Sequence, residues 1–129
     1  MPQTWFDLAS DARKAANRLV SDNYRSCVAR AYYAAYSTVT YALAIAPGVS
    51  FPANREGPNH PGETGSGGIR RMIETSMPDM DQKRRVKLSE LIGRLYTLRI
   101  FADYRPSVEV EGGDARNAIS LMNTIFDWF

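Results

Sequence analysis

The sequence contains a single histidine and a single cysteine, and this scarcity excludes several kinds of site. A typical zinc centre takes three or four ligands from histidine and cysteine, so we expect no metal site of that kind. Cys27 has no second cysteine with which to pair, which excludes an intramolecular disulfide and gives no support to secretion. A Ser/His/Asp triad would have to recruit His60, and no sequence motif indicates one.

The sequence also has no long apolar run. Its least polar stretch, residues 27–46, contains Arg30, several tyrosines and several hydroxyl side chains, and is more typical of a buried helix than of a membrane span. The first residues lack the basic and apolar regions of a signal peptide. Glycine motifs of the P-loop and dinucleotide-binding types are absent as well. We therefore expect a cytoplasmic protein that has no membrane contact and no cofactor.

What is present is the composition of an ordinary globular domain. Of the 129 residues, 44% are hydrophobic and 23% are charged. This length is typical of one domain, which we take to span residues 1–129. The net charge of +2 is too small for a polycation, so contact with nucleic acid would require a local basic patch.

Apolar residues recur at helical spacing along most of the chain, and no convincing strand pattern interrupts them. Thr4 is placed to cap the first helix with Asp7 as its capping-box partner, and Asp114 is placed to cap the last. The second helix is apolar on most of its circumference, which predicts a central position. Steps of three and four between apolar positions predict an all-α fold, an antiparallel four-helix bundle with an extra short helix. The expected helices cover residues 5–20, 24–46, 69–76, 79–103 and 115–129.

Residues 47–68 are predicted to form a long loop. They include four of the seven prolines and six of the nine glycines, a composition that excludes regular structure. Loops of this length inside a compact domain are usually functional or disordered. A lid over a small-molecule pocket is one hypothesis for this loop, although no motif supports it.

Two polar segments lie on otherwise apolar helices. The first is the Arg-Ala-Tyr-Tyr-Ala-Ala-Tyr run of residues 30–36, where Arg30 either reaches solvent beside packed aromatic rings or belongs to a polar site. The second contains Arg99, Asp103 and Tyr104. Arg99 and Asp103 are four residues apart and share a helix face, which is typical of an ordinary salt bridge. An arginine beside a tyrosine hydroxyl can also hold a phosphate through paired hydrogen bonds.

The two segments together resemble the small bacterial HEPN-domain proteins. The resemblance rests on the run at residues 30–36 in the second helix and on the Arg-x-x-Ala-Asp-Tyr run at residues 99–104, and it covers nearly the whole chain. The His60-Pro61-Gly62 sequence is also similar to a histidine-glycine element of some relatives.

This resemblance implies a helical bundle that often forms a homodimer. Many HEPN proteins are metal-independent ribonucleases of toxin–antitoxin, phage-defence or CRISPR-linked systems, and others bind RNA or nucleotides without catalysis. Several pair with a small nucleotidyltransferase. Catalytic members carry an Arg-x4–6-His motif, in which the arginine steadies the phosphate and the histidine moves protons or orients the 2′-hydroxyl.

The chain departs from that motif because no histidine follows Arg99. Tyr104 stands near the position of the missing histidine, and a phenol of ordinary pKa near 10 is a poor base at neutral pH. His60 can replace the histidine only if the loop folds back onto the end of the fourth helix. Our candidate catalytic residues are accordingly Arg99, Asp103, Tyr104 and His60.

A basic cluster precedes and opens the fourth helix. Clustered lysine and arginine attract a phosphate backbone without regard to sequence, although such runs are often simply solvated. Together with Arg30, the candidate nucleic-acid-binding residues are Arg70, Arg71, Lys83, Arg84, Arg85 and Lys87.

Two functions remain open at this point. One is a HEPN-like protein that binds RNA or nucleotides, a toxin-type component with metal-independent ribonuclease activity. The other is a non-catalytic module that docks a partner such as a nucleotidyltransferase or an antitoxin. Under the second, Tyr104 is a candidate for nucleotide modification by the partner. Trp128 and Phe129, two large apolar residues at the end of the sequence, favour a homodimer or pack within the monomer.

Overall fold

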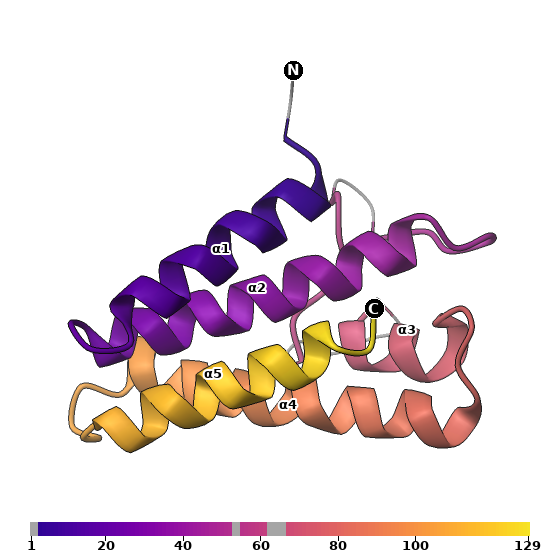
Figure 1. The fold of residues 1–129 in the computed structure, drawn as a ribbon. Coiled ribbons are helices and arrows are strands. Elements are labelled where there is room, and N and C mark those ends of the chain that lie inside the picture. Colours follow the sequence, from indigo (N-terminus) through magenta and orange to yellow (C-terminus); the bar gives the residue numbers. More distant parts are fainter. Residues whose placement is uncertain (1–2, 53–54, 62–66) are drawn as a thin grey trace.

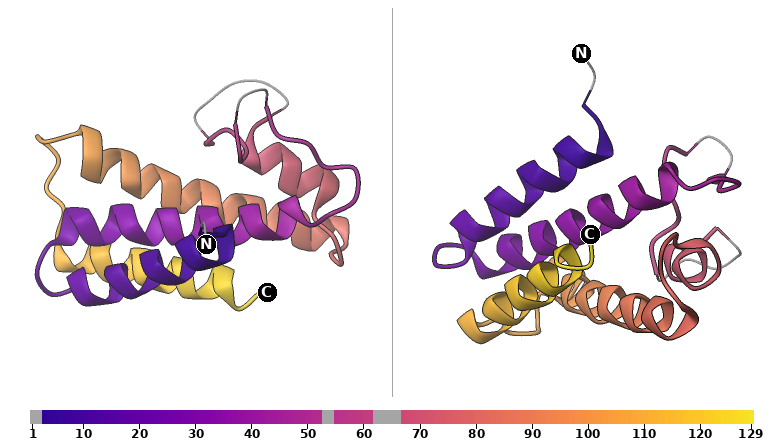
Figure 2. Two further views of the ribbon diagram at one scale, coloured as in Figure 1. Left: turned by 90° about the horizontal axis from the view of Figure 1, so that it is seen from above. Right: turned by 45° about the vertical axis from the view of Figure 1, so that its right-hand side comes forward.

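The computed structural model describes residues 3–52, 55–61 and 67–129, and in this part of the chain it is all-helical. The five helices are α1 (Trp5–Leu19), α2 (Tyr24–Ala44), α3 (Ile69–Ser76), α4 (Gln82–Tyr104) and α5 (Gly112–Phe126). The long helices run alternately in opposite directions, and the short α3 lies beside the first half of α4 (Figures 1 and 2). The predicted antiparallel bundle with an extra short helix is confirmed. An isolated bridge joins Asn59, in the middle of the long loop, to Gly68 at its end.

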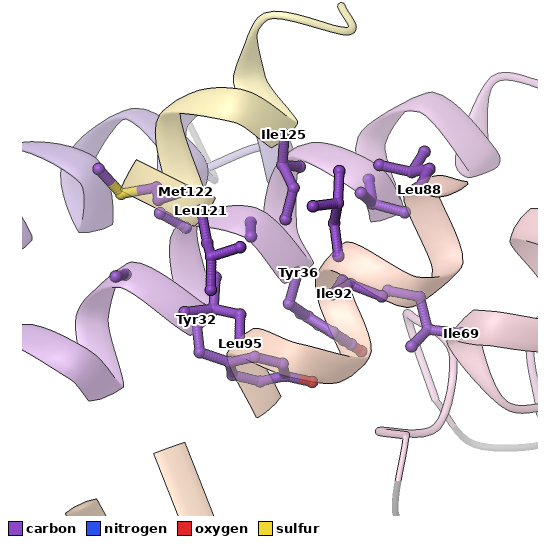
Figure 3. Close-up of a cluster of buried hydrophobic side chains, with 14 of the residues drawn as sticks. Tyr32, Tyr36, Ile69, Leu88, Ile92, Leu95, Leu121, Met122 and Ile125 are labelled. Atoms are coloured by element: carbon purple, nitrogen blue, oxygen red, sulfur yellow. The ribbon is translucent and has the colours of Figure 1, made fainter. Parts of the chain in front are cut away.

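α2 is the central helix, as its nearly continuous apolar surface predicted. It packs against each of the other four helices, whereas α1 packs chiefly on α2 and lies away from α4 (Figures 1 and 2). Small side chains, including Ala12, Ala16, Ala31 and Ala34, are fully or almost fully buried and allow helix axes to approach closely. Figure 3 shows the centre of the core, where Tyr32 and Tyr36 of α2 meet Leu95 of α4.

Side chains cap the first two helices, and the cap of α1 is the one that the sequence predicted. Thr4 and Asp7 form a capping box, with the Thr4 backbone amide donating to the Asp7 carboxylate at 3.0 Å. Asn23 caps α2 by accepting a hydrogen bond from the Ser26 amide at 3.1 Å. α2 ends at Ala44, two residues before the predicted end.

The starts of α4 and α5 differ from the prediction. Asp79 was expected to begin α4, but it has a φ of 61°, which lies outside the helical region. The helix starts at Gln82, and Asp81 caps it by accepting a hydrogen bond from the Arg84 amide at 2.9 Å. Asp114 was expected to cap α5, but Glu111 is the N-cap, and Asp114 is its capping-box partner inside the helix.

Among the described helices, none combines the length and apolar character that crossing a membrane requires.

Candidate functional site

A cleft of about 290 Å³ lies between the first half of α2 and the last turns of α4. It brings together the two polar segments that the sequence analysis singled out. Arg99 and Asp103 come from α4, and the side chains of α2 add two hydroxyls and a second guanidinium. The lining residues are Ser26, Ala29, Arg30, Tyr33, Arg99 and Asp103.

Three contacts fix the position of the Arg99 side chain. Its Nε donates to Oδ2 of Asp103 at 3.1 Å, and its guanidinium carbon lies 5.4 Å from the ring centroid of Tyr32 and 5.8 Å from that of Tyr104. The side chains of Arg99 and Asp103 are 24% and 29% exposed, so neither is sealed inside the bundle. Within the described part of the chain, no acceptor is hydrogen-bonded to the two terminal amino groups of Arg99. These groups are therefore available to a ligand in the cleft.

The predicted Arg99–Asp103 salt bridge and the predicted phosphate-binding role are compatible in this geometry. A guanidinium has five N–H donors, and the Asp103 contact engages only Nε. Arg30 supplies a second guanidinium to the same cleft. The two arginines and one aspartate leave a net positive charge at a site that also offers the hydroxyls of Ser26 and Tyr33.

Arg25 supports this site and was not identified from the sequence. It extends from the first turn of α2 to the end of α4, where its Nη1 donates to the carbonyl oxygens of Phe101 at 3.1 Å and Ala102 at 2.9 Å. Its Nη2 donates to the carbonyl oxygen of Val108 in the following loop. A cation at this position satisfies carbonyls that the helix leaves free and complements the helix dipole. Arg25 thereby ties the turn that carries Asp103 to α2.

Comparison of the chain with models of known protein families, with curated proteins and with solved structures gives no match.

His60 lies outside the cleft. The loop does fold back onto the bundle, but it places His60 against the tyrosines of α2, with Nδ1 2.6 Å from the hydroxyl of Tyr32 and the ring stacked on Tyr36 at 4.5 Å. Tyr32 thus contacts His60 through its hydroxyl and Arg99 through its ring. The adjoining Gly62 lies outside the described residues.

Tyr104 lies at the rim of the site rather than in the cleft. It is 62% exposed and ends α4, next to the guanidinium of Arg99. The tyrosine that lines the cleft is Tyr33 of α2, a residue that the sequence motif contains but that we did not select. Helical spacing offered a signal, because Ser26, Arg30 and Tyr33 lie three or four positions apart.

The basic cluster is divided among different structural settings. Arg85 donates to the carbonyl oxygen of Met77 at 2.9 Å and so caps the end of α3, and Arg84 lies over the ring of Trp128. Arg70 donates to the buried hydroxyl of Ser89 at 2.9 Å and lines a second, shallow hollow. The remaining members, Arg71, Lys83 and Lys87, are exposed. None of these six residues lines the cleft that contains Arg99 and Arg30.

The described residues contain no group of three or more histidine, cysteine, aspartate or glutamate side chains that could hold a metal ion. Cys27 is fully buried, and burial raises the pKa of its thiol above the ordinary value of 9.0. Because the thiolate is the reactive form, Cys27 is not a candidate nucleophile.

Proposed function

We propose that the protein binds RNA or a nucleotide, with a phosphate held in the cleft between α2 and α4. The observation that carries this proposal is the presence of Arg99 and Arg30 in one cleft, with the terminal amino groups of Arg99 unpaired among the described residues. The planar fork of a guanidinium matches two phosphate oxygens, and arginine is common where phosphate is recognised.

Three further features of the cleft support a phosphate ligand. The Asp103 contact and the two aromatic rings fix the orientation of Arg99, which reduces the entropy lost on binding. The hydroxyls of Ser26 and Tyr33 can donate to further phosphate oxygens. The exposed ring of Tyr104 at the rim offers a surface on which a base can stack. These features also agree with the resemblance to HEPN proteins.

The same geometry favours binding over cleavage. A metal-independent ribonuclease needs a group that accepts or donates a proton near neutral pH, and histidine is the usual choice. His60 is hydrogen-bonded to Tyr32 and does not line the cleft. We therefore propose binding of RNA or a nucleotide as the main function. Ribonuclease activity in a toxin–antitoxin or phage-defence system is the second candidate.

Equilibrium binding of a fluorescently labelled single-stranded RNA tests the proposal. We expect Arg99→Gln and Arg30→Gln each to weaken binding by about fivefold to tenfold, the effect of losing a charged hydrogen bond at a partly exposed site. Arg18→Gln, an exposed arginine at the end of α1, is the matched control and should leave affinity unchanged. Equal affinity for the wild type and both cleft variants would refute the proposed site.

The same RNA, incubated with the protein and a chelator of divalent metals, separates binding from cleavage. Intact RNA agrees with a binding module. Cleavage that is lost in Arg99→Gln would identify a metal-independent ribonuclease acting at the same cleft.

The exposure of Tyr104 supports a second proposal, modification by a partner nucleotidyltransferase. The phenolic oxygen would attack the α-phosphate of a nucleoside triphosphate, with pyrophosphate as the leaving group and the phenolic proton passing to solvent. Intact mass after co-expression with a nucleotidyltransferase would then increase by one nucleotidyl group in the wild type. An equal increase in Tyr104→Phe, or no increase in the wild type, would exclude this modification.

A further inference from the structure

A second concave surface lies where α1, the end of α2 and the end of α5 meet. We call it the terminal groove. It consists of two adjoining hollows of about 430 and 340 Å³, and Phe6, Thr38 and Phe129 line both of them. The groove shares no lining residue with the Arg99 cleft. It results from the arrangement of the helices, because α1 packs mainly on α2 and makes few contacts with α5 (Figure 2).

The groove exposes large apolar side chains from three elements. Ile45 is 67% exposed, Phe6 60% and Phe129 50%, and Tyr41 adds a further partly exposed ring. Single exposed apolar residues are common on protein surfaces, but several that line one hollow are typical of an interaction site.

Two arginines stand beside this apolar surface. The guanidinium carbon of Arg13 lies 4.4 Å from the ring centroid of Phe126, and that of Arg84 lies 5.4 Å from the ring centroid of Trp128. Arg13 is further fixed by a hydrogen bond to Asn123 at 3.0 Å. Each hollow therefore has one guanidinium in its wall, and among the residues that the structure describes, Asp79 is the only acidic one that lines either hollow.

The charges indicate what covers the groove. If a second copy of the chain docked through the same surface, the interface would contain four arginines and only two aspartates, so like charges would predominate. A partner with acidic side chains beside its apolar face would instead pair with Arg13 and Arg84. Charge complementarity thus favours a different protein over a second copy.

The walls of the groove indicate the shape of that partner. They are formed by helices and by the turns that follow or precede them, and no strand is among the described residues that line the groove, so an extended peptide would find no strand edge to join. An amphipathic helix satisfies its own backbone and presents apolar side chains at intervals of three, four or seven residues, which suits two adjoining hollows.

We propose that the terminal groove binds an amphipathic helix of a partner protein, with one apolar side chain in each hollow and acidic residues beside Arg13 and Arg84. This site is independent of the phosphate cleft, and either can exist without the other.

A displayed library of helical peptides of roughly 15 residues, about four helical turns, provides the probe. Peptides that bind the wild-type protein are selected, and those that also bind the Ile45→Glu variant are removed. This variant places a charge in the groove at an exposed position. We expect enrichment of peptides that carry two apolar residues on one face with aspartate or glutamate beside them. No enrichment beyond that seen with Ile45→Glu, or enrichment of basic flanks, would overturn the proposal.

An enriched peptide is then synthesised and its affinity measured by fluorescence anisotropy. We expect Arg13→Gln and Arg84→Gln each to weaken binding by about threefold to tenfold, and Arg18→Gln to leave it unchanged. Equal affinity for all four proteins would contradict the charge argument. Circular dichroism and RNA binding of Ile45→Glu should match the wild type, which shows that the variant is folded.

Light scattering of the wild type tests the competing occupant. A dimer that Ile45→Glu converts to a monomer would show that a second copy fills the groove and would overturn the proposal. A dimer that survives Ile45→Glu uses another face and leaves the groove open to the partner helix, as we expect.

Discussion

The hydroxyl of Tyr32 forms a hydrogen bond of 2.6 Å with Nδ1 of His60. This contact holds the only histidine of the sequence away from the cleft between α2 and α4. Tyr32 is fully buried at the centre of the bundle, and its hydroxyl gives the long loop a polar anchor on α2. The loop is anchored again where the Tyr36 hydroxyl donates to the carbonyl oxygen of Pro58 at 2.7 Å.

Substitution of Tyr32 by phenylalanine tests this anchor. The variant keeps the ring that Arg99 contacts but loses the hydroxyl, so we expect the free energy of unfolding to fall by about 1 kcal/mol. Urea denaturation followed by circular dichroism measures the change. RNA affinity should be unaffected because His60 lies outside the cleft. Stability equal to that of the wild type would show that the hydrogen bond contributes nothing.

Arg25→Ala should lower the free energy of unfolding more than most surface substitutions do. Its guanidinium donates to carbonyl oxygens at the end of α4 and in the loop that follows, and hydrogen bonds of a charged group each contribute roughly 1.5–3 kcal/mol. Because Arg25 is only partly buried, we expect the total loss of stability to lie near the lower end of this range, at about 1.5 kcal/mol.

Arg25→Lys should restore little of this stability, because a single ammonium cannot reach the same set of carbonyls. Urea denaturation measures the stability of both variants, with Arg18→Ala as the control. RNA affinity should also fall in Arg25→Ala, since the turn that holds Asp103 is released. Full rescue by lysine would indicate that charge alone matters.

Cys27 should be unreactive in the folded protein. Burial raises the pKa of its thiol above 9.0, and the sulfur donates a hydrogen bond to the carbonyl oxygen of Ala16 at 3.3 Å. The folded protein keeps this proton to a higher pH than the unfolded chain does. The resulting stability is present below the unfolded pKa of about 9 and is lost as the pH rises through the folded value.

A chromogenic thiol reagent measures this reactivity. We expect slow reaction with the native protein at neutral pH and fast reaction in denaturant. Rapid reaction of the native protein would contradict the burial of the thiol.

Gly57→Ala should destabilise the docking of the loop on α1 and α2. A methyl group at this position would come 2.8 Å from the Tyr36 hydroxyl and 3.1 Å from the ring of Trp5. Overpacking of this kind typically costs about 1–3 kcal/mol. Gly113→Ala is the comparison without a steric clash, because the nearest atom there is 3.9 Å away, and it should be neutral or stabilising since alanine favours the helix α5. Thermal unfolding of the two variants should differ clearly, and equal melting temperatures would argue against tight packing of the loop.

The sequence was sufficient to predict the helices but not all of their boundaries. The apolar spacing located the bundle, and the Thr4 cap was recognisable because a short polar side chain precedes apolar periodicity. The start of α4 was misplaced because Pro78-Asp79 has the composition of a helix start. The positive φ of Asp79 depends on the tertiary path from α3 to α4, which local pattern does not encode.

The site was predictable only where its residues share a helix. Arg99 and Asp103 are four positions apart, so their pairing followed from helical geometry. The pairing of Tyr32 with His60 joins α2 to a loop 28 residues away, and the contact of Arg25 with the end of α4 spans about 80. Such long-range contacts depend on how the helices pack. The settings of the basic residues could not be predicted from the sequence for the same reason. Arg84 and Arg85 are adjacent in sequence, but Arg84 contacts Trp128 and Arg85 contacts the end of α3.

The salt dependence of RNA binding tests the central claim most directly. Each phosphate contact of a single strand contributes about 0.7 to the slope of log K against log salt concentration, measured between about 50 and 200 mM. Arg30 and Arg99 line one cleft and on this account hold one phosphate, so the double variant Arg30→Gln/Arg99→Gln should have a slope smaller than that of the wild type by about 0.7. The Arg18→Gln control should keep the wild-type slope. A double variant with the slope and affinity of the wild type would show that no phosphate lies between these two guanidinium groups.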